Sequence, residues 1–328
     1  MAHKEKSCKL NKSSILSTLK INKISCISSD DSSIENVEMR NPVIKFNEKD
    51  INRLEIQHHL FRIIWNGNFS VPMQHQLSRG SVNVLEVGSC PLVWTLDMAS
   101  EYPSSTFIGI ENISSITAAS YSKLSSYYSS KIPEPRNAAV LQMTSSTPTS
   151  LPFPDETFDL VYHKSSLINP SSQSLHNPFN TLNQLLRVLK PGGWLEFMII
   201  EKQWFNLGPI TEYVKNSYVE FLSSTGINYI EYSYFERYLT SRKDISCIRK
   251  QIKETPIGSF GGRVGEFLGE VLLNPIKHNK HNLCIRMKIS EKKFDELINV
   301  MIKEINQYKT YCRSIRLYAR KQSSARNS

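Results

Sequence analysis

The stretch Val84-Leu-Glu-Val-Gly-Ser-Cys-Pro-Leu-Val-Trp94 decides the fold that we expect. It begins as a buried apolar strand with an acid, Glu86, and a glycine, Gly88, at its end, as cofactor-binding loops do. Such loops carry a second and a third glycine at two-residue steps, whereas this chain has Cys90 and Leu92 there. The stretch therefore predicts a strand–loop–helix unit whose loop lacks two of its glycines.

Strand and helix patterns alternate on both sides of this stretch. Apolar runs predict strands at residues 82–87, 105–111, 137–143, 157–164, 194–200, 247–258 and 310–319. Helices are expected at residues 91–102, 114–128 and 176–190. Repeated alternation is typical of a doubly wound α/β fold, so we expect a seven-stranded, mostly parallel sheet with a Rossmann-like arrangement.

The composition along the chain suggests three parts. Residues 1–46 are rich in Ser and Lys with few large apolar groups, so we expect a disordered leader. Residues 47–321 are expected to form one domain, and residues 322–328 a disordered tail. Within the domain we expect a helical cap at 47–80, a cofactor-binding core at 81–200, and substrate-side helices with the last strands at 201–321. Helices are predicted after Pro209 and at residues 261–276 and 291–308, with a polar loop at 277–282.

Charge, cysteine usage and hydropathy limit the classes of function. The formal net charge is +10, and much of it lies near the two ends, which fits either solvated tails or a tether for an acidic partner. We favour solvated tails and expect no nucleic-acid partner, because no aromatic residues alternate with the basic ones to stack on bases. The six cysteines are scattered without a C-x-x-C pair, so neither a zinc site nor a disulfide framework is indicated. No run approaches the length of a membrane span, and we expect an intracellular protein, cytoplasmic or nuclear.

The second expected strand ends at Glu111, 23 residues beyond Gly88. An acid at this place can accept hydrogen bonds from both hydroxyls of a ribose, which fits NAD, FAD or S-adenosylmethionine. A pyrophosphate needs glycines where it touches the loop, so Cys90 and Leu92 count against a dinucleotide. S-adenosylmethionine carries no phosphate, so the replacement of the two loop glycines matters less for its binding. A nicotinamide oxidoreductase is also disfavoured because the Tyr-x-x-x-Lys pair, Tyr127 and Lys131, lies on the helix after the second strand.

Two further runs narrow the family. "LPFPDETFDLVYHK" (Leu151 to Lys164) is a rigid turn that leads into a strand, and "LLRVLKPGGWLEF" (Leu185 to Phe197) is a helix end followed by a strand. Together with Glu86 and Gly88, they resemble the class I S-adenosylmethionine-dependent methyltransferases. More narrowly, residues 47–321 resemble a fungal group that includes proposed regulators of secondary metabolism. The resemblance implies transfer of a methyl group from S-adenosylmethionine to an unidentified acceptor, a small molecule or a protein. The alternative is a catalytically inactive relative that serves as a binding or regulatory module.

The same resemblance implies roles for individual positions. Glu86 would orient the methionine end of the cofactor, and Glu111 would hold its ribose. Serines stand where the family often places Asp or Asn to bind the adenine amino group. The positions that the resemblance assigns to the cofactor are Glu86, Gly88, Ser89, Cys90, Glu111, Asn112, Ser145, Ser146 and Tyr162.

Candidates for the chemistry itself are few. Methyl transfer relies largely on positioning, and a base is needed only if the acceptor must lose a proton. His163, after the fourth strand, is our candidate base, and the alternative is a strand-end histidine with ordinary hydrogen bonds. The substrate pocket could be capped by Trp65, Asn68 and Phe69. The alternative for the two aromatic residues is that they are simply buried at the end of a helix. The run that contains His278 and His281 is better explained as a solvated polar loop than as a pair of metal ligands, so no metal is expected. The oligomeric state stays open.

Overall fold

A mixed sheet of eight strands forms the centre of the molecule. The computed structural model describes residues 24–27, 48–88, 93–112, 137–143, 150–165, 178–225 and 231–323. The strand order is β1-β4-β3-β2-β5-β6-β8-β7. The strands are β1 (Ile24–Ile27), β2 (Asn83–Gly88), β3 (Thr106–Asn112), β4 (Ala138–Met143), β5 (Phe158–Ser165), β6 (Leu189–Phe205), β7 (Ile245–Pro256) and β8 (Tyr311–Lys321).

The seven strands that the sequence predicts are all present, and a doubly wound, mostly parallel α/β sheet is confirmed. The pairs from β1 to β6 are parallel, and β8 runs antiparallel between β6 and β7. The eighth strand, β1, lies inside the segment that we expected to be disordered. It pairs with β4 from Ile24↔Val140 to Ile27↔Met143, so it satisfies backbone groups at what would otherwise be the sheet edge. The rest of the expected leader and residues 324–328 lie outside the described residues.

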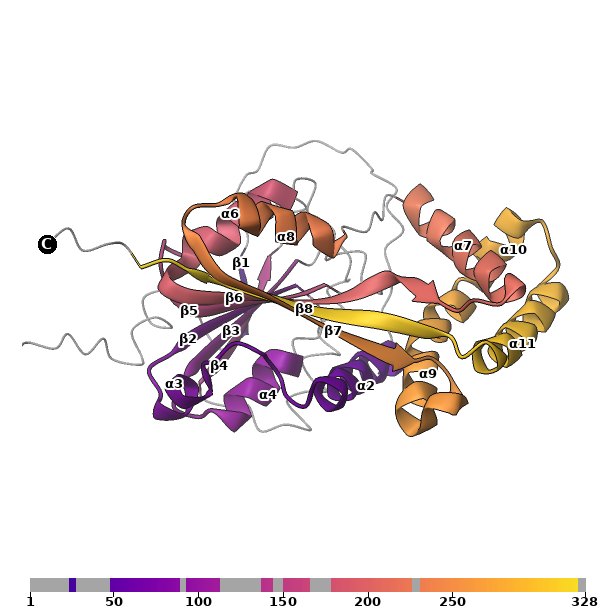
Figure 1. Ribbon diagram of the computed structural model, residues 1–328, viewed down its shortest axis with the longest axis horizontal. Helices are drawn as coiled ribbons and strands as arrows, with labels where there is room; N and C mark the ends of the chain where they lie inside the picture. Colours follow the sequence, from indigo (N-terminus) through magenta and orange to yellow (C-terminus); the bar gives the residue numbers. More distant parts are fainter. Residues whose placement is uncertain are drawn as a thin grey trace, which may run out of the picture.

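Helices cover both faces of the sheet (Figure 1). On one face lie α2 (Glu48–Trp65), α3 (Gln74–Arg79) and α4 (Val93–Glu101), and on the other α6 (Pro178–Val188) and α8 (Tyr232–Ser241). Each face has its own buried cluster, centred on residues such as Trp94 and Met98 on the first and Phe158 and Phe197 on the second. Helices α2 and α3 occupy the range expected for the cap. The helix predicted at 114–128 lies outside the described residues.

A group of helices extends the fold beyond the far end of β6 (Figure 1). It consists of α7 (Pro209–Ser224), α9 (Gly262–His278), α10 (Lys280–Met287) and α11 (Glu291–Gln307). Glu304 of α11 holds the start of α7, because its carboxylate accepts hydrogen bonds from the backbone N–H groups of Ile210 (3.2 Å) and Thr211 (2.7 Å). These contacts satisfy donors that the first turn of a helix leaves free.

The prediction of a polar loop at residues 277–282 is wrong. Helix α9 continues to His278 and α10 begins at Lys280, so Asn279 alone separates them. The side chain of Asn279 donates to the carbonyl of Pro275 at 2.9 Å, and Leu283 is fully buried. Polar composition therefore marks exposed helix ends here, and the buried side chains of Leu283 and Cys284 fix α10 on its neighbours.

Candidate functional site

The end of β2 approaches β5 so closely that only glycine fits at position 88. Gly88 has φ +133°, and a Cβ built there would lie 2.7 Å from the carbonyl oxygen of Lys164. The two residues are register partners at the carboxyl ends of their parallel strands. Ligands of open α/β sheets bind at this edge, so Gly88 shapes the site through its backbone.

The carboxyl group of Glu86 is held on one side only. Its Oε2 accepts hydrogen bonds from the backbone N–H (3.0 Å) and the hydroxyl (2.6 Å) of Thr95, in the first turn of α4. Its Oε1 accepts none from any residue that the structure describes. Burial raises the pKa of Glu86 to about 7, although Thr95 and the ammonium of Lys164 act in the opposite direction. Glu86 is thus a fixed, buried carboxyl group with one oxygen left to bind a donor.

Tyr162 lies beside Glu86 on the same face of the sheet, since the two are register partners. Its ring stacks on that of Trp94, with centroids 4.1 Å apart and an interplanar angle of 1°. The indole Nε1 of Trp94 donates to the carbonyl of Asn68 at 2.8 Å. Burial raises the pKa of Tyr162 above its ordinary value. The pair therefore joins the site to the segment that follows α2.

His163 faces the other side of the sheet. It is buried, and its ring lies 5.6 Å from that of Phe197 and 6.4 Å from that of Phe235 on α8. Its Nδ1 has no hydrogen-bond partner among the residues that the structure describes, and burial lowers its pKa to about 4. Because side chains alternate along a strand, the structure does not bring His163 together with Glu86 and Tyr162.

The remaining predicted cofactor positions are placed only in part. Glu111 and Asn112 end β3, which pairs with β2, so their backbone lies at the expected edge of the sheet. The loop positions Ser89 and Cys90 and the serines at 145 and 146 lie outside the described residues. The geometry therefore supports a strand-end place for Glu111.

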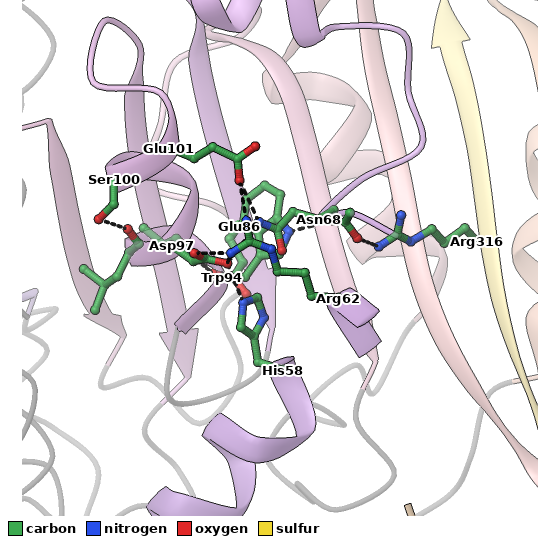
Figure 2. A network of polar contacts seen from close by, with 12 residues as sticks. His58, Arg62, Asn68, Glu86, Trp94, Asp97, Ser100, Glu101 and Arg316 are labelled. Atoms are coloured by element: carbon green, nitrogen blue, oxygen red, sulfur yellow. Dashed lines mark hydrogen bonds and ion pairs between the residues drawn. The ribbon is translucent and has the colours of Figure 1, made fainter. Parts of the chain in front are cut away.

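Asp97 of α4 holds the cap to the core (Figure 2). Its carboxylate binds the Nε2 of His58 at 2.9 Å, the guanidinium of Arg62 at 2.7 and 2.8 Å, and the side-chain amide of Asn68 at 3.0 Å. Burial alone would raise the pKa of Asp97, but the hydrogen bonds from His58 and Asn68 and the charge of Arg62 bring it down to about 2. Asp97 therefore fixes α2 against α4 as a carboxylate.

A second polar cluster fixes the turn after α2. Glu196 of β6 accepts hydrogen bonds from the backbone N–H groups of Ser70 (2.8 Å) and Val71 (3.0 Å). Arg316 of β8 lies 3.6 Å from Glu196, donates to the carbonyl of Gly67 at 2.7 Å, and stacks over Trp65 at 4.8 Å. Trp65 is thus buried against the sheet, one of the two roles that the sequence left open.

Four residues of these two clusters were not predicted as site residues from the sequence: His58, Asp97, Glu196 and Arg316. A signal for two of them was present, because Glu196 and Arg316 interrupt the apolar runs of expected strands. Charged residues are almost never fully buried unless they are paired, so each of these charges implied a partner. The identity of that partner depends on contacts between distant parts of the chain.

Within the described ranges, His, Cys, Asp and Glu side chains form no group of three or more that could hold a metal ion. In those same ranges, no helix has both the length and the apolar character needed to cross a membrane.

Comparisons with known proteins agree with this geometry. Residues 85–197 match the model of a family described as a methyltransferase domain. This range begins in β2 and ends in β6, and it contains Glu86, Gly88, Glu111 and Tyr162. No curated protein matches the chain.

Several solved structures resemble the chain at low identity. The YcgJ protein from Bacillus subtilis is 14% identical, with a TM-score of 0.46, and the match covers 82% of this chain and 100% of that one. Coclaurine N-methyltransferase, solved with N-methylheliamine and SAH, is 12% identical with a TM-score of 0.46, covering 84% and 76%. Phosphoethanolamine N-methyltransferase 2 from Haemonchus contortus, solved with phosphomonomethylethanolamine and S-adenosylhomocysteine, is 16% identical with a TM-score of 0.42, covering 83% and 58%. At these scores the likeness carries no argument about activity or substrate. The core of the chain from β2 to β6 is thus similar, by its family match, to a methyltransferase domain.

Proposed function

We propose that this protein is an S-adenosylmethionine-dependent methyltransferase whose acceptor is a small molecule or a protein. One observation carries the proposal: Glu86, buried beside the retained Gly88, keeps Oε1 free of hydrogen bonds from the described residues. This carboxyl group lies at the carboxyl end of β2, inside the range that matches a methyltransferase domain.

The residues present fit S-adenosylmethionine, the cofactor that the family match supports. Glu86 would accept a hydrogen bond from the ammonium group of its methionine part, since Thr95 occupies only Oε2. Glu111, at the end of the neighbouring strand β3, would bind the ribose hydroxyls. The cofactor supplies an electrophilic methyl group on a sulfonium. It brings no phosphate to seat on the loop, so the loss of glycines at Cys90 and Leu92 does not exclude it.

His163 has no part in this proposal as a base. Its imidazole packs against Phe197 and Phe235 on the opposite face from Glu86. Ser89, Cys90, Asn112, Ser145 and Ser146 stay proposed cofactor contacts on the strength of the sequence resemblance.

The runner-up proposal is a catalytically inactive relative that binds a partner or regulates another protein. Its support is the replacement of two loop glycines by Cys90 and Leu92, and the resemblance to the fungal group that includes proposed regulators. For both proposals we infer an intracellular place, cytoplasmic or nuclear, from the scattered cysteines.

Calorimetric titration of purified variants tests the proposed site. Glu111→Ala should weaken binding of S-adenosylmethionine at least about tenfold, because a ribose hydrogen bond to a charged group is lost. Glu212→Ala, at an exposed acid in the first turn of α7, is the matched control and should bind as the wild type does. Equal affinities for Glu111→Ala and the wild type would contradict the assignment of the ribose site.

A further inference from the structure

We propose that His58 accepts the proton of the methyl acceptor, and that this acceptor reacts through a hydroxyl group. The inference rests on the proposed function, since it adds a proton-accepting residue to the same site. It follows from the arrangement of His58 with Asp97 on α4, the helix whose Thr95 also binds Glu86.

Asp97 sets the tautomer of His58. The Nε2 of His58 lies 2.9 Å from Oδ2 of Asp97, and this carboxylate is itself held by Arg62 and Asn68 (Figure 2). A carboxylate only accepts hydrogen bonds, so the imidazole must carry its proton on Nε2. The lone pair is then on Nδ1, which has no hydrogen-bond partner among the described residues. An imidazole oriented by a carboxylate in this way can take up a proton on its other nitrogen.

His58 also lies near the edge of the sheet where the methyl donor is proposed to bind. The ammonium of Lys164 acts electrostatically on both His58 and Glu86. Lys164 is one residue from the end of β5 and is the register partner of Gly88. His58 and Glu86 are thus both bound to α4, through Asp97 and Thr95, and both feel the charge of Lys164 near the carboxyl end of β5.

Burial keeps the imidazole of His58 neutral. Burial is the largest effect and lowers its pKa to about 4, although the hydrogen bond that His58 donates to Asp97 acts to raise it. The imidazole is therefore neutral at neutral pH and keeps a lone pair that can accept a proton. The next residue, His59, is exposed on the same helix and offers an internal comparison.

The reaction step balances as follows. The acceptor oxygen forms a bond to the methyl carbon while the carbon–sulfur bond breaks, and the electron pair of that bond stays on sulfur. The hydroxyl proton moves to Nδ1 of His58, and Asp97 stabilises the resulting imidazolium. The products are a methyl ether, neutral S-adenosylhomocysteine and protonated His58, which returns its proton to solvent.

This arrangement indicates the class of acceptor. A phenol keeps its proton near neutral pH, as the side chain of tyrosine does, so its oxygen gains most from a base that acts during the transfer. An amine that is already unprotonated, or a thiolate, offers a lone pair without losing a proton. A base such as His58 therefore points to a hydroxyl, in a phenol or an alcohol.

Two cofactor analogues test the position of Nδ1 without a known acceptor. Sinefungin carries an amine-bearing carbon in place of the methylsulfonium, and S-adenosylhomocysteine has neither group. Both are titrated calorimetrically into the wild type, His58→Leu and His59→Leu. If Nδ1 faces the transfer position, the amine donates to it, and the wild type should bind sinefungin roughly tenfold more tightly than S-adenosylhomocysteine. His58→Leu should lose this preference and keep its affinity for S-adenosylhomocysteine, and His59→Leu should behave as the wild type.

The outcomes separate the two proposals. If the wild type binds neither analogue, the proposed function itself fails. If it binds both but His58→Leu weakens them equally, or changes neither, His58 is only structural and the inference is overturned. Long-range ¹⁵N spectra of the histidine-labelled wild-type protein give a second test, which does not depend on whether any variant folds. They should show one imidazole protonated on Nε2 at neutral pH whose Nδ1 resonance shifts with sinefungin, and no such shift would overturn the inference.

Discussion

The ring of Trp94 lies parallel to the ring of Tyr162, with an interplanar angle of 1° and centroids 4.1 Å apart. Trp94 is the second residue of α4, and Tyr162 lies on β5 beside the buried Glu86. The indole also donates to the carbonyl of Asn68 in the segment after α2. One aromatic contact thus joins the helix after the cofactor loop, the sheet and the cap.

Replacing Trp94 should therefore destabilise the whole cofactor-binding core. Trp94→Ala is expected to lower the free energy of unfolding by about 3–5 kcal/mol, because it leaves a large cavity and removes the stacked pair. Urea unfolding followed by circular dichroism measures this change. Ile63→Ala, at a side chain that is 66% exposed, should change stability by roughly 0.5 kcal/mol or less. A loss for Trp94→Ala no larger than that of the control would show that the stack adds nothing.

Glu86 should lower stability as the pH rises. Burial raises its pKa in the folded protein to about 7 from the ordinary value of 4.5, so the folded state holds the proton to a higher pH than the unfolded state does. Below pH 4.5 the group is protonated in both states and costs nothing. Between pH 4.5 and about pH 7 the free energy of unfolding falls, by roughly 3 kcal/mol in total. Above about pH 7 this loss of stability is constant.

Glu86→Gln removes this titration and keeps an oxygen for Thr95. The variant should match the wild type in stability near pH 4.5, exceed it by roughly 1–3 kcal/mol at pH 8, and bind S-adenosylmethionine more weakly. Unfolding curves at a series of pH values check the difference between the two proteins. If that difference does not change with pH, Glu86 does not titrate as its burial implies.

Gly88 should tolerate no side chain. Gly88→Ala places a Cβ 2.7 Å from the carbonyl oxygen of Lys164 at φ +133°, so we expect a loss of about 1–3 kcal/mol in stability and loss of cofactor binding. Gly262→Ala is the matched control, since Gly262 also has a positive φ (+63°) but no atom within 4 Å of its built Cβ. Thermal unfolding and calorimetric titration measure both effects. Equal behaviour of the two variants would rule out the close approach as the cause.

The two Arg–Glu pairs of the last strands should differ sharply in energy. Glu196→Gln leaves the guanidinium of Arg316 buried without a counter-charge and should cost about 3–5 kcal/mol. Glu254→Gln removes the partner of Arg313 in an exposed pair and should cost about 1 kcal/mol or less. Urea unfolding of the two variants compares them directly. Similar costs would mean that Glu196 does not hold the turn after α2.

The sequence predicted seven of the eight described strands because their apolar runs are long and regular, and it missed the four-residue strand β1. The acid and glycine at the end of β2 also followed from the sequence, since strand ends and turns leave local signals. The polar run at 277–282 misled, because exposed helix ends have the same composition as a loop. The ring contact between Trp94 and Tyr162 and the pairing of His58 with Asp97 depend on the packing of separate elements. The spacing of residues along the chain does not predict such contacts. For this reason the sequence indicated His163 rather than His58 as the candidate base.

The central claim is that this fold binds S-adenosylmethionine despite its missing glycines. Calorimetric titration of the wild-type protein with S-adenosylmethionine, with NADH as the comparison ligand, tests it most directly. The account predicts one S-adenosylmethionine bound per chain with a micromolar dissociation constant, and no binding of NADH. No binding of S-adenosylmethionine at millimolar concentration would contradict the account and leave the chain as a catalytically inactive relative.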